Sequence, residues 1–116
     1  MKITLCGSRR FWNEFVGYNR ELSLAGHVVY SLGAFKTTGE AEMNLSDDEK
    51  WTLDLVHLAK IEESDAIFVV GDGYVGDSTK REIKWTRIRG KKVYWAKNYE
   101  HLVSLGIRSL QANDYD

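Results

Sequence analysis

A run of five apolar residues, 66–70, leads directly into a loop with three glycines and then into a helical pattern. The loop and the start of the helix span residues 71–82 and read GDGYVGDSTKRE, with the helical pattern beginning at Asp77 or Ser78. The free N–H groups at a helix N-terminus favour anions, so this order of strand, loop and helix offers a docking place for a polar or phosphorylated ligand. Glu82 follows one turn into the helix, where its carboxylate can reach such a ligand.

Apolar strands alternate with helical segments along the chain. Strands are expected at 2–6, 27–32, 66–70 and 92–96, and helices at 13–25, 47–64, 78–89 and 99–105. This alternation predicts an α/β fold, in which helices cover both faces of a four- to five-stranded, mainly parallel sheet. Ligands of such sheets bind beyond the carboxyl ends of the strands, near the point where the strand order reverses. The loops at that edge are 7–12, 71–78, 96–99 and the long, mobile 33–46.

Local signals mark the ends of several helices. Gly26 is placed to end the first helix in the left-handed conformation that glycine adopts easily, and Gly90 to end the third. Ser46 and Glu49 have the spacing of a capping box at the start of the second helix. Residues 111–116 read as a frayed end.

The length and composition indicate one cytoplasmic domain, residues 1–116. A chain of 116 residues with 43% apolar residues can bury a modest core, and it contains no apolar run long enough to span a membrane. Arg9 and Arg10 follow the first strand too soon for a signal peptide. The single cysteine, Cys6, excludes an internal disulfide and fits a reducing compartment. Its apolar neighbours indicate a small buried residue in preference to a catalytic thiol.

Positive charge gathers in the segment 80–92, which holds seven cations against one acid, Glu82. One interpretation is a solvated helix face followed by a basic turn. The other is an electropositive wall that attracts anionic ligands. The cations expected to face solvent are Lys80, Lys84, Arg87 and Lys91. A net charge of −1 argues against binding to duplex DNA.

The first loop, GSRR at residues 7–10, follows the first strand directly. Glycine lets the backbone approach a ligand, Ser8 offers a hydroxyl, and the arginines offer forked donors for phosphate or carboxylate. Phe11 and Trp12 come next and could stack on a base. The segment lacks the glycine spacing of a dinucleotide fingerprint and the lysine of a P-loop, so an ordinary turn with solvated arginines is the alternative.

The second loop brings several polar residues to one helix face. Ser78, Thr79 and Glu82 are three or four residues apart and share a face, which Thr86 continues. Glu82 either faces a ligand or caps the helix start at Ser78 or Thr79. Asp77 flanks this loop and could serve as a cap, as an acceptor for a sugar hydroxyl, or as a proton donor.

Asp72 also flanks the loop, with the same three possible roles. Two carboxylates near one anomeric carbon suit glycosyl chemistry, in which one attacks carbon and the other handles protons. His57 has no cysteine or second histidine at ligand spacing along the chain, so no zinc site is expected. Asp54 lies one turn before His57, so the two could project together from the helix; a packed or capping histidine is the alternative.

Two segments carry a resemblance to known proteins. Residues 5–11, LCGSRRF, are similar to the strand-and-GSR start of the SLOG superfamily of Rossmann-like nucleotide-binding domains. Residues 60–83, KIEESDAIFVVGDGYVGDSTKREI, resemble small bacterial and phage members of the nucleoside 2-deoxyribosyltransferase-like family. Transferases usually carry a D-x-G-T-like signature before the glutamate, where this chain has DST at 77–79. The resemblance implies a flavodoxin/Rossmann-like three-layer sandwich and a nucleoside or nucleotide ligand.

The resemblance also implies an activity. Glu82 matches the family's nucleophile on C1′ of deoxyribose, so cleavage or transfer at an N-glycosidic bond is expected, with no metal or other cofactor needed. Asp72 and Asp77 are the further catalytic candidates. The expected substrate- and phosphate-binding residues are Gly7, Ser8, Arg9, Arg10, Phe11, Gly73, Tyr74, Gly76, Ser78 and Thr79. The alternatives are a non-catalytic module that senses a nucleotide and an interaction protein with a vestigial site.

The resemblance finally implies assembly, because family members commonly pair through helices. Trp51, Leu55, Leu58 and Ile61 follow one side of the helix expected at 47–64. This apolar side is the candidate surface for a homodimer or a higher homo-oligomer.

Overall fold

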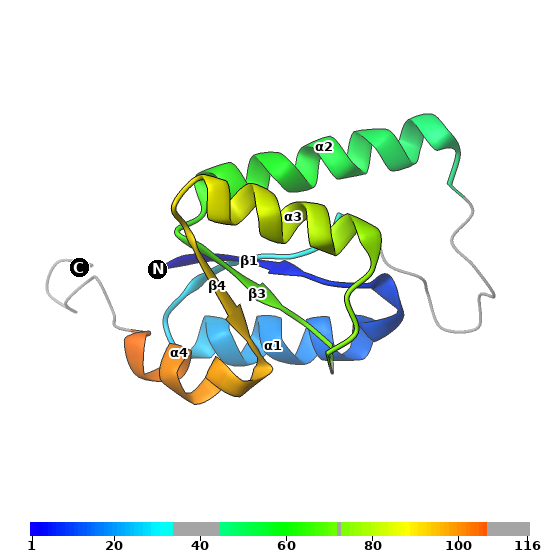
Figure 1. The fold of residues 1–116 in the computed structure, drawn as a ribbon. Coiled ribbons are helices and arrows are strands. Elements are labelled where there is room, and N and C mark those ends of the chain that lie inside the picture. Colours follow the sequence, from blue (N-terminus) through cyan, green and yellow to red (C-terminus); the bar gives the residue numbers. More distant parts are fainter. Residues whose placement is uncertain (34–44, 72, 107–116) are drawn as a thin grey trace, which may run out of the picture.

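Four parallel strands form one sheet in the order β2-β1-β3-β4 (Figure 1). The computed structural model describes residues 1–33, 45–71 and 73–106, so most of the predicted loop 33–46, Asp72 and the predicted frayed end lie outside the described residues. The strands are β1 (Lys2–Cys6), β2 (Val28–Tyr30), β3 (Ala66–Val69) and β4 (Lys92–Trp95). Every pairing is parallel, with Ile3 of β1 opposite both Val29 and Ala66.

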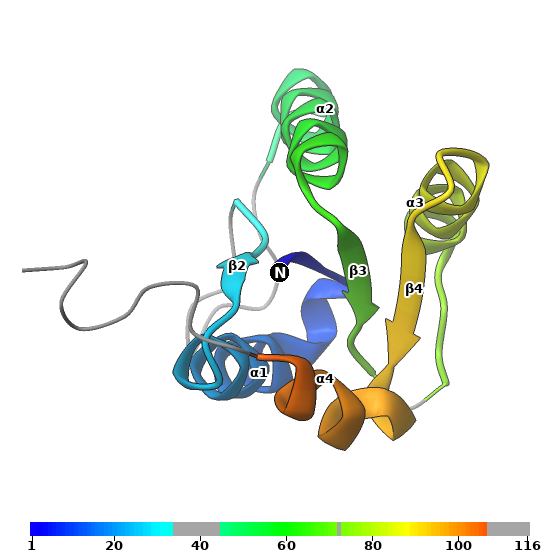
Figure 2. The same cartoon turned by 90° about the vertical axis from the view of Figure 1, so that its left-hand side faces the viewer.

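Helices cover both faces of the sheet (Figure 2). Two of them, α1 (Trp12–Leu24) and α4 (Tyr99–Leu105), lie on one face, and α2 (Asp47–Glu63) and α3 (Asp77–Ile88) lie on the other. Short 3-10 turns, η1 (Arg9–Phe11) and η2 (Ala96–Asn98), follow β1 and β4. The predicted α/β sandwich is confirmed, with four strands, all parallel, in the part of the chain that the structure describes. None of the described helices is long and apolar enough to cross a membrane.

The side chains of β1 alternate between two cores, as the twofold repeat of a strand requires. Ile3 and Leu5 pack with Phe15 and Phe68 on the α1/α4 side. Cys6 packs with Ile61 and other apolar side chains on the α2/α3 side, and Thr4 faces the same way, bonded to Ser64 at the end of α2. Residues 3–6 are all fully buried, so β1 is covered on both faces of the sheet.

The predicted helix ends are confirmed. Gly26 follows α1 with φ 98° and Gly90 follows α3 with φ 69°. The Ser46 hydroxyl accepts from the backbone N–H of Glu49 at 3.1 Å, and the Glu49 carboxylate accepts from the N–H of Ser46 at 2.9 Å. The bond from the Ser46 backbone N–H, and then the Ser46 side chain, hold the pKa of the Glu49 carboxyl below its usual range.

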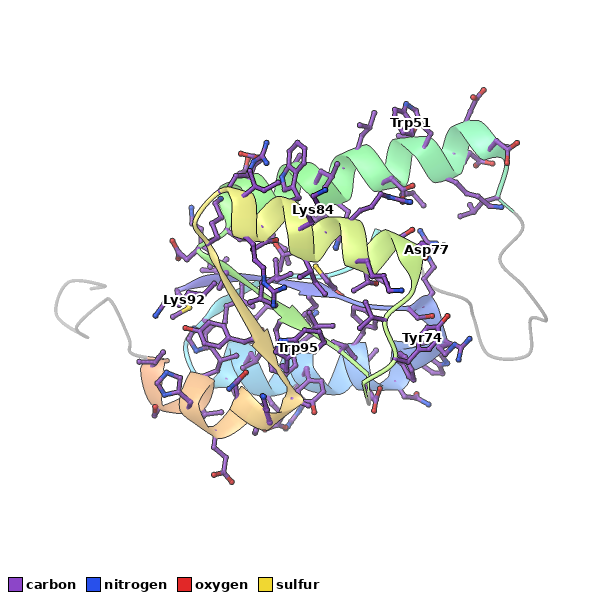
Figure 3. All side chains as sticks on the ribbon, in the orientation of Figure 1. Trp51, Tyr74, Asp77, Lys84, Lys92 and Trp95 are labelled. Atoms are coloured by element: carbon purple, nitrogen blue, oxygen red, sulfur yellow. The ribbon has the colours of Figure 1, made fainter. Side chains whose placement is uncertain are left out.

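Two expectations about helix surfaces are wrong in part. Trp51 and Leu55, on the candidate surface for assembly, are 64% and 48% exposed, whereas Ile61, expected on the same side, is buried in the core with His57. Figure 3 shows Trp51 on the outer side of α2. Lys91 does not point freely into solvent: its Nζ donates to the carbonyls of Ile61, at 2.9 Å, and Glu62, at 2.5 Å, which satisfies the C-terminus of α2.

Candidate active site

A cavity of about 250 Å³ opens beyond the carboxyl ends of β1 and β3. Because β2 lies on one side of β1 and β3 on the other, the strand order reverses here, which is the usual ligand position in such sheets. The loops after three strands and the helices α2 and α3 supply its walls. They contribute Gly7, Ser8 and Arg9 after β1; Leu32 and Gly33 after β2; Tyr74, Gly76, Asp77, Ser78, Thr79 and Glu82 after β3; and Leu53, Asp54 and His57 from α2.

Glycines let the loop after β1 and the loop after β3 pass each other at close range. Gly7 has φ +142°, and a Cβ there would lie 2.6 Å from the carbonyl oxygen of Val70. Gly71 has φ +114°, and its Cβ would lie 2.8 Å from the Phe11 ring. Both a left-handed backbone and the lack of room exclude side chains at these positions. The crossing brings the loop after β1 against the loop that leads into α3.

The N-terminus of α3 forms one wall of the cavity. Gly76 is the N-cap, and its carbonyl accepts the first helical hydrogen bond, from Lys80, at 2.9 Å. The first turn then carries Asp77, Ser78 and Thr79 along the cavity. A helix start presents N–H groups without intrahelical partners, together with the positive end of the helix dipole. This wall therefore suits an anionic group.

Glu82 reaches into the cavity from the second turn of α3. Its side chain is only 15% exposed, and its Oε2 atom lies 3.5 Å from Nε2 of His57 on α2. Thr79 and Thr86, on the same face of the helix, are buried, and the Thr86 hydroxyl donates to the Glu82 carbonyl at 2.7 Å. The carboxyl therefore lies between two helices, away from the helix start that it was alternatively expected to cap.

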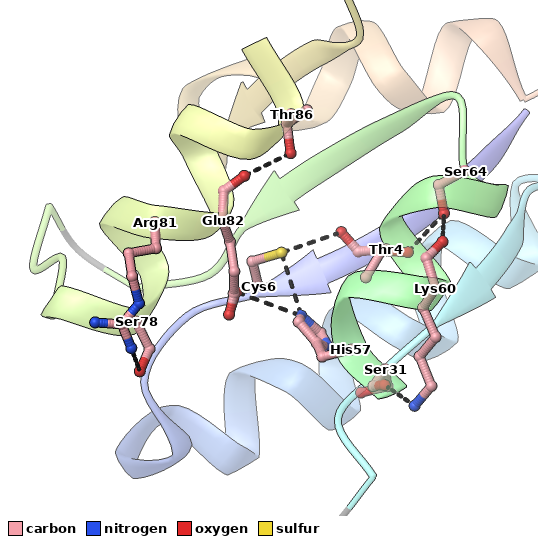
Figure 4. A network of polar contacts seen from close by, with 10 residues as sticks. All are labelled: Thr4, Cys6, Ser31, His57, Lys60, Ser64, Ser78, Arg81, Glu82 and Thr86. Atoms are coloured by element: carbon pink, nitrogen blue, oxygen red, sulfur yellow. Dashed lines mark hydrogen bonds and ion pairs between the residues drawn. The ribbon is translucent and has the colours of Figure 1, made fainter. Parts of the chain in front are cut away.

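Cys6 completes a three-residue polar cluster beneath the cavity (Figure 4). Its Sγ lies 3.4 Å from Nε2 of His57. The three side chains come from the end of β1, the middle of α2 and α3, and Figure 4 shows Glu82 and Cys6 turned toward the imidazole. Cys6 is on this side because β1 alternates, and Ile61, one turn after His57, anchors α2 in the same core.

Burial dominates the electrostatics of this cluster. It lowers the pKa of His57 to about 4, aided by the positive charges of Lys60 and Arg9. It raises the pKa of Glu82 to about 7, against the lowering effects of the Cys6 thiol, Arg81 and Arg9. Burial and the neighbouring Glu82 raise the pKa of Cys6 well above its usual value. At neutral pH the imidazole is therefore uncharged, so its contact with Glu82 is no ion pair.

Most of the residues predicted from the sequence line this cavity. They are Gly7, Ser8, Arg9, Tyr74, Gly76, Asp77, Ser78, Thr79 and Glu82. The lining does not include Arg10, Phe11 or Gly73. The Arg10 guanidinium stacks over the Tyr74 ring, 4.2 Å from its centre, and Phe11 meets the edge of the same ring and packs against Gly71. Asp72 lies outside the described residues.

Cys6 and His57 were not predicted as part of the site. Cys6 is fully buried, as expected of a small residue at the end of a strand. Its proximity to His57 could not be read from spacing along the chain, because β1 and α2 meet only in the fold. Two signals in the sequence indicate that Cys6 and His57 face the same core. The side chains of β1 alternate between the two faces of the sheet, and His57 lies one helical turn before the apolar Ile61. Asp54, expected to project with His57, does line the cavity with it.

Comparisons with known proteins support the fold. No protein-family profile matches the sequence. No curated protein matches it closely enough to indicate a relative. Among solved structures, the CMP N-glycosidase BcmB of Clostridium botulinum aligns over 99% of this chain and 94% of its own, with a TM-score of 0.55 and 18% identity. This similarity shows a shared α/β fold.

Proposed function

We propose that the chain binds a nucleoside or nucleotide in this cavity and cleaves its N-glycosidic bond, as a SLOG-type enzyme related to the nucleoside 2-deoxyribosyltransferases. The observation that carries the proposal is the position of Glu82, whose largely buried carboxyl lines a cavity at the switch point of a parallel sheet. The shared fold with a protein named as a CMP N-glycosidase supports the same chemistry.

Glu82 acts as the nucleophile in this proposal. One carboxylate oxygen forms a bond to C1′ of the sugar, while the electron pair of the C1′–N bond leaves with the base, which takes up a proton. Water then attacks C1′, loses a proton, and releases the sugar and the Glu82 carboxylate. Asp77 on α3 and Asp54 on α2, which also line the cavity, are the carboxyls that exchange these protons. Transfer would replace water by a second base.

The remaining walls bind the substrate. The first turn of α3, with Ser78 and Thr79, and the guanidinium of Arg9 suit a 5′-phosphate. Nε of Arg9 is buried and has no hydrogen-bond partner among the described residues, so it is free to donate to a ligand. The side chains of Leu32, Leu53 and Tyr74 give the base and the sugar an apolar surface.

The proposal is tested by incubating the full chain with a panel of nucleosides and nucleoside monophosphates, in ribo and deoxy forms, and measuring free base by chromatography. Base release that depends on Glu82 supports the proposal. Including a second free base in the reaction separates transfer from hydrolysis, because only a transferase makes the exchanged nucleoside.

A nucleotide sensor without catalysis is the second candidate. One observation favours it: burial raises the pKa of Glu82 to about 7, so about half of the molecules carry a protonated, non-nucleophilic carboxyl at pH 7. A nucleotide that raises the melting temperature and stays intact through long incubation would favour the sensor.

We propose further that copies of the chain associate through the outer side of α2. Trp51, Leu55 and Val56 are exposed there, at 64%, 48% and 44%. Burying such side chains in an interface would stabilise a dimer. Light scattering tests this: a wild-type dimer that Trp51→Glu converts into a monomer supports the interface, and a wild-type monomer at high concentration contradicts it.

A further inference from the structure

Three metal-binding side chains meet at the floor of the cavity. The donor atoms of Cys6, His57 and Glu82 all lie within 4.8 Å of one another. Sγ of Cys6 is 3.4 Å from Nε2 of His57, and Nε2 is 3.5 Å from Oε2 of Glu82. In a tetrahedral zinc site, with Zn–S near 2.3 Å and Zn–N and Zn–O near 2.0–2.2 Å, neighbouring ligand atoms are about 3.3–3.6 Å apart. The two distances match that geometry.

The hydrogen bonding of the cluster is incomplete. Oε2 of Glu82 and Nδ1 of His57 are buried and have no hydrogen-bond partner among the described residues, and the His57 side chain is only 8% exposed. The thiol proton of Cys6 can serve one acceptor at a time. Lone pairs of sulfur, nitrogen and oxygen therefore face one another, and the cluster has too few protons to form hydrogen bonds with all of them. A bound cation would accept all three lone pairs.

We propose that Cys6, His57 and Glu82 bind a thiophilic divalent cation of the zinc class, and that the bound cation blocks the cavity. The blocking effect rests on the proposed function, because the cation would occupy the carboxylate that attacks the sugar. The binding site itself does not depend on that function. Three protein ligands leave the fourth position of a tetrahedral ion for water or for a group in the cavity.

The protons that the ligands release and the charges that they carry are compatible with a bound dication. Binding forms the S–metal bond as the Cys6 thiol proton leaves to solvent, and a protonated Glu82 releases its proton in the same way. The Cys6 thiolate and the Glu82 carboxylate then supply two negative charges against the two positive charges of the ion, while the carboxylates of Asp54 and Asp77 and the guanidinium of Arg9 also line the cavity. The charges of these two ligands therefore cancel that of the ion, and the imidazole of His57 is the neutral third ligand.

The test uses Co²⁺ as a coloured substitute for zinc. The chain contains one cysteine, so a sulfur-to-cobalt charge-transfer band can come only from Cys6. Chelator-treated full-length protein titrated with Co²⁺ is expected to develop this band, with the intense visible absorption of four-coordinate cobalt, at one ion per chain. Zn²⁺ is expected to bleach it. Absence of the band, or a band that appears without the visible absorption, would overturn the site.

Variants locate the ligands. Cys6→Ser is expected to lose the band, and His57→Gln to weaken Co²⁺ binding at least about tenfold, as even loss of a supporting contact does at metal sites. His101→Gln, at an exposed histidine of α4, is the matched control and should bind like the wild type. Circular dichroism checks each variant's fold. If Cys6→Ser is unfolded, the His57→Gln titration decides, and unchanged binding there overturns the three-ligand site.

Base release separates this inference from the proposed function. If chelator-treated protein releases base, stoichiometric Zn²⁺ should abolish the reaction and excess chelator should restore it. If no substrate releases base, the proposed function fails, while the cobalt spectrum still decides the site. Full turnover with one cobalt bound per chain would overturn the blocking role.

Discussion

Nε2 of His57 lies 3.5 Å from Oε2 of Glu82, which joins α2 to α3 directly above the buried thiol of Cys6. Burial of His57 lowers its pKa and keeps the imidazole uncharged at neutral pH, so it gives the carboxylate no ion pair, and burial of Glu82 raises the pKa of the carboxyl to about 7. The carboxyl of Glu82 therefore titrates near neutrality, with consequences for activity that can be measured.

The first prediction is that base release by metal-free protein rises with pH through about 7. In the proposed reaction Glu82 must be ionised to attack carbon, and burial raises its pKa to about 7. The other ionisable groups that act on it are His57, Cys6, Asp54, Arg81 and Arg9. Below the midpoint, kcat/KM should fall about tenfold per pH unit. The profile is measured in chelator, from about pH 5 to 9.

Asp54→Asn should move this midpoint to lower pH, because the negative charge of Asp54 raises the pKa of Glu82. Glu63→Gln, at an exposed acid near the end of α2, should leave it unchanged. A kcat/KM that is flat or falls between pH 6 and 8 would be incompatible with an ionised Glu82 as the attacking group.

The second prediction compares two neighbouring arginines. Arg9 lines the cavity, whereas Arg10 stacks on Tyr74. Arg9→Gln should weaken binding of a nucleoside monophosphate by about 1.5–3 kcal/mol, or roughly 10- to 150-fold, as expected for the loss of a charged hydrogen bond. Binding of the unphosphorylated nucleoside should change little. Calorimetry measures both. Equal losses for Arg9→Gln and Arg10→Gln would argue against a phosphate contact at Arg9.

The third prediction concerns the loop crossing. Gly7→Ala should destabilise the fold by about 1–3 kcal/mol, because φ is +142° and the new Cβ would lie 2.6 Å from the Val70 carbonyl. At Gly17, within α1, a Cβ would meet nothing within 4 Å beyond the adjacent backbone of its own helix, so Gly17→Ala should stabilise by about 0.5–1 kcal/mol. Urea denaturation gives both values. A Gly7→Ala variant as stable as the wild type would contradict the close crossing.

The fourth prediction tests a buried hydroxyl pair. Ser64 donates to the Lys60 carbonyl at 2.8 Å, so Thr4 must be the donor in its 2.5 Å bond to Ser64. Ser64→Ala leaves the Thr4 hydroxyl without this acceptor and should cost about 1–3 kcal/mol. Adding Thr4→Val removes the stranded donor and should recover part of the loss. Additive losses in the double-mutant cycle would show that the two hydroxyls are not coupled.

The fold was predictable because its signals are local. Residues 66–70 are an apolar run, residues 2–6 are mostly apolar, and Gly26, Gly90 and the Ser46–Glu49 box mark helix ends with their own chemistry. The order of strands and helices then leaves few arrangements other than a parallel sheet. Ile61 was grouped with Trp51 because the apolar side of a helix shows which face is hydrophobic without showing what covers it.

The candidate site was predictable only where its residues are close together in the sequence. Ser78, Thr79 and Glu82 are close in sequence, so helical spacing alone places them on one face. Cys6 and His57 lie far apart in the chain, and their contact depends on how α2 crosses the end of β1. Arg9 and Arg10 are adjacent and chemically identical, and only the short turn η1 decides that one lines the cavity and the other covers Tyr74.

The most direct test of the account is the rate of base release by Glu82→Gln, which keeps the size of the side chain and removes its charge. With chelator-treated protein at saturating substrate, we predict a loss of about 10³-fold or more, while Glu63→Gln retains the wild-type rate. The melting temperature of each variant checks that the fold is intact. A folded Glu82→Gln variant that releases base as fast as the wild type would contradict the central claim that this carboxylate attacks the sugar.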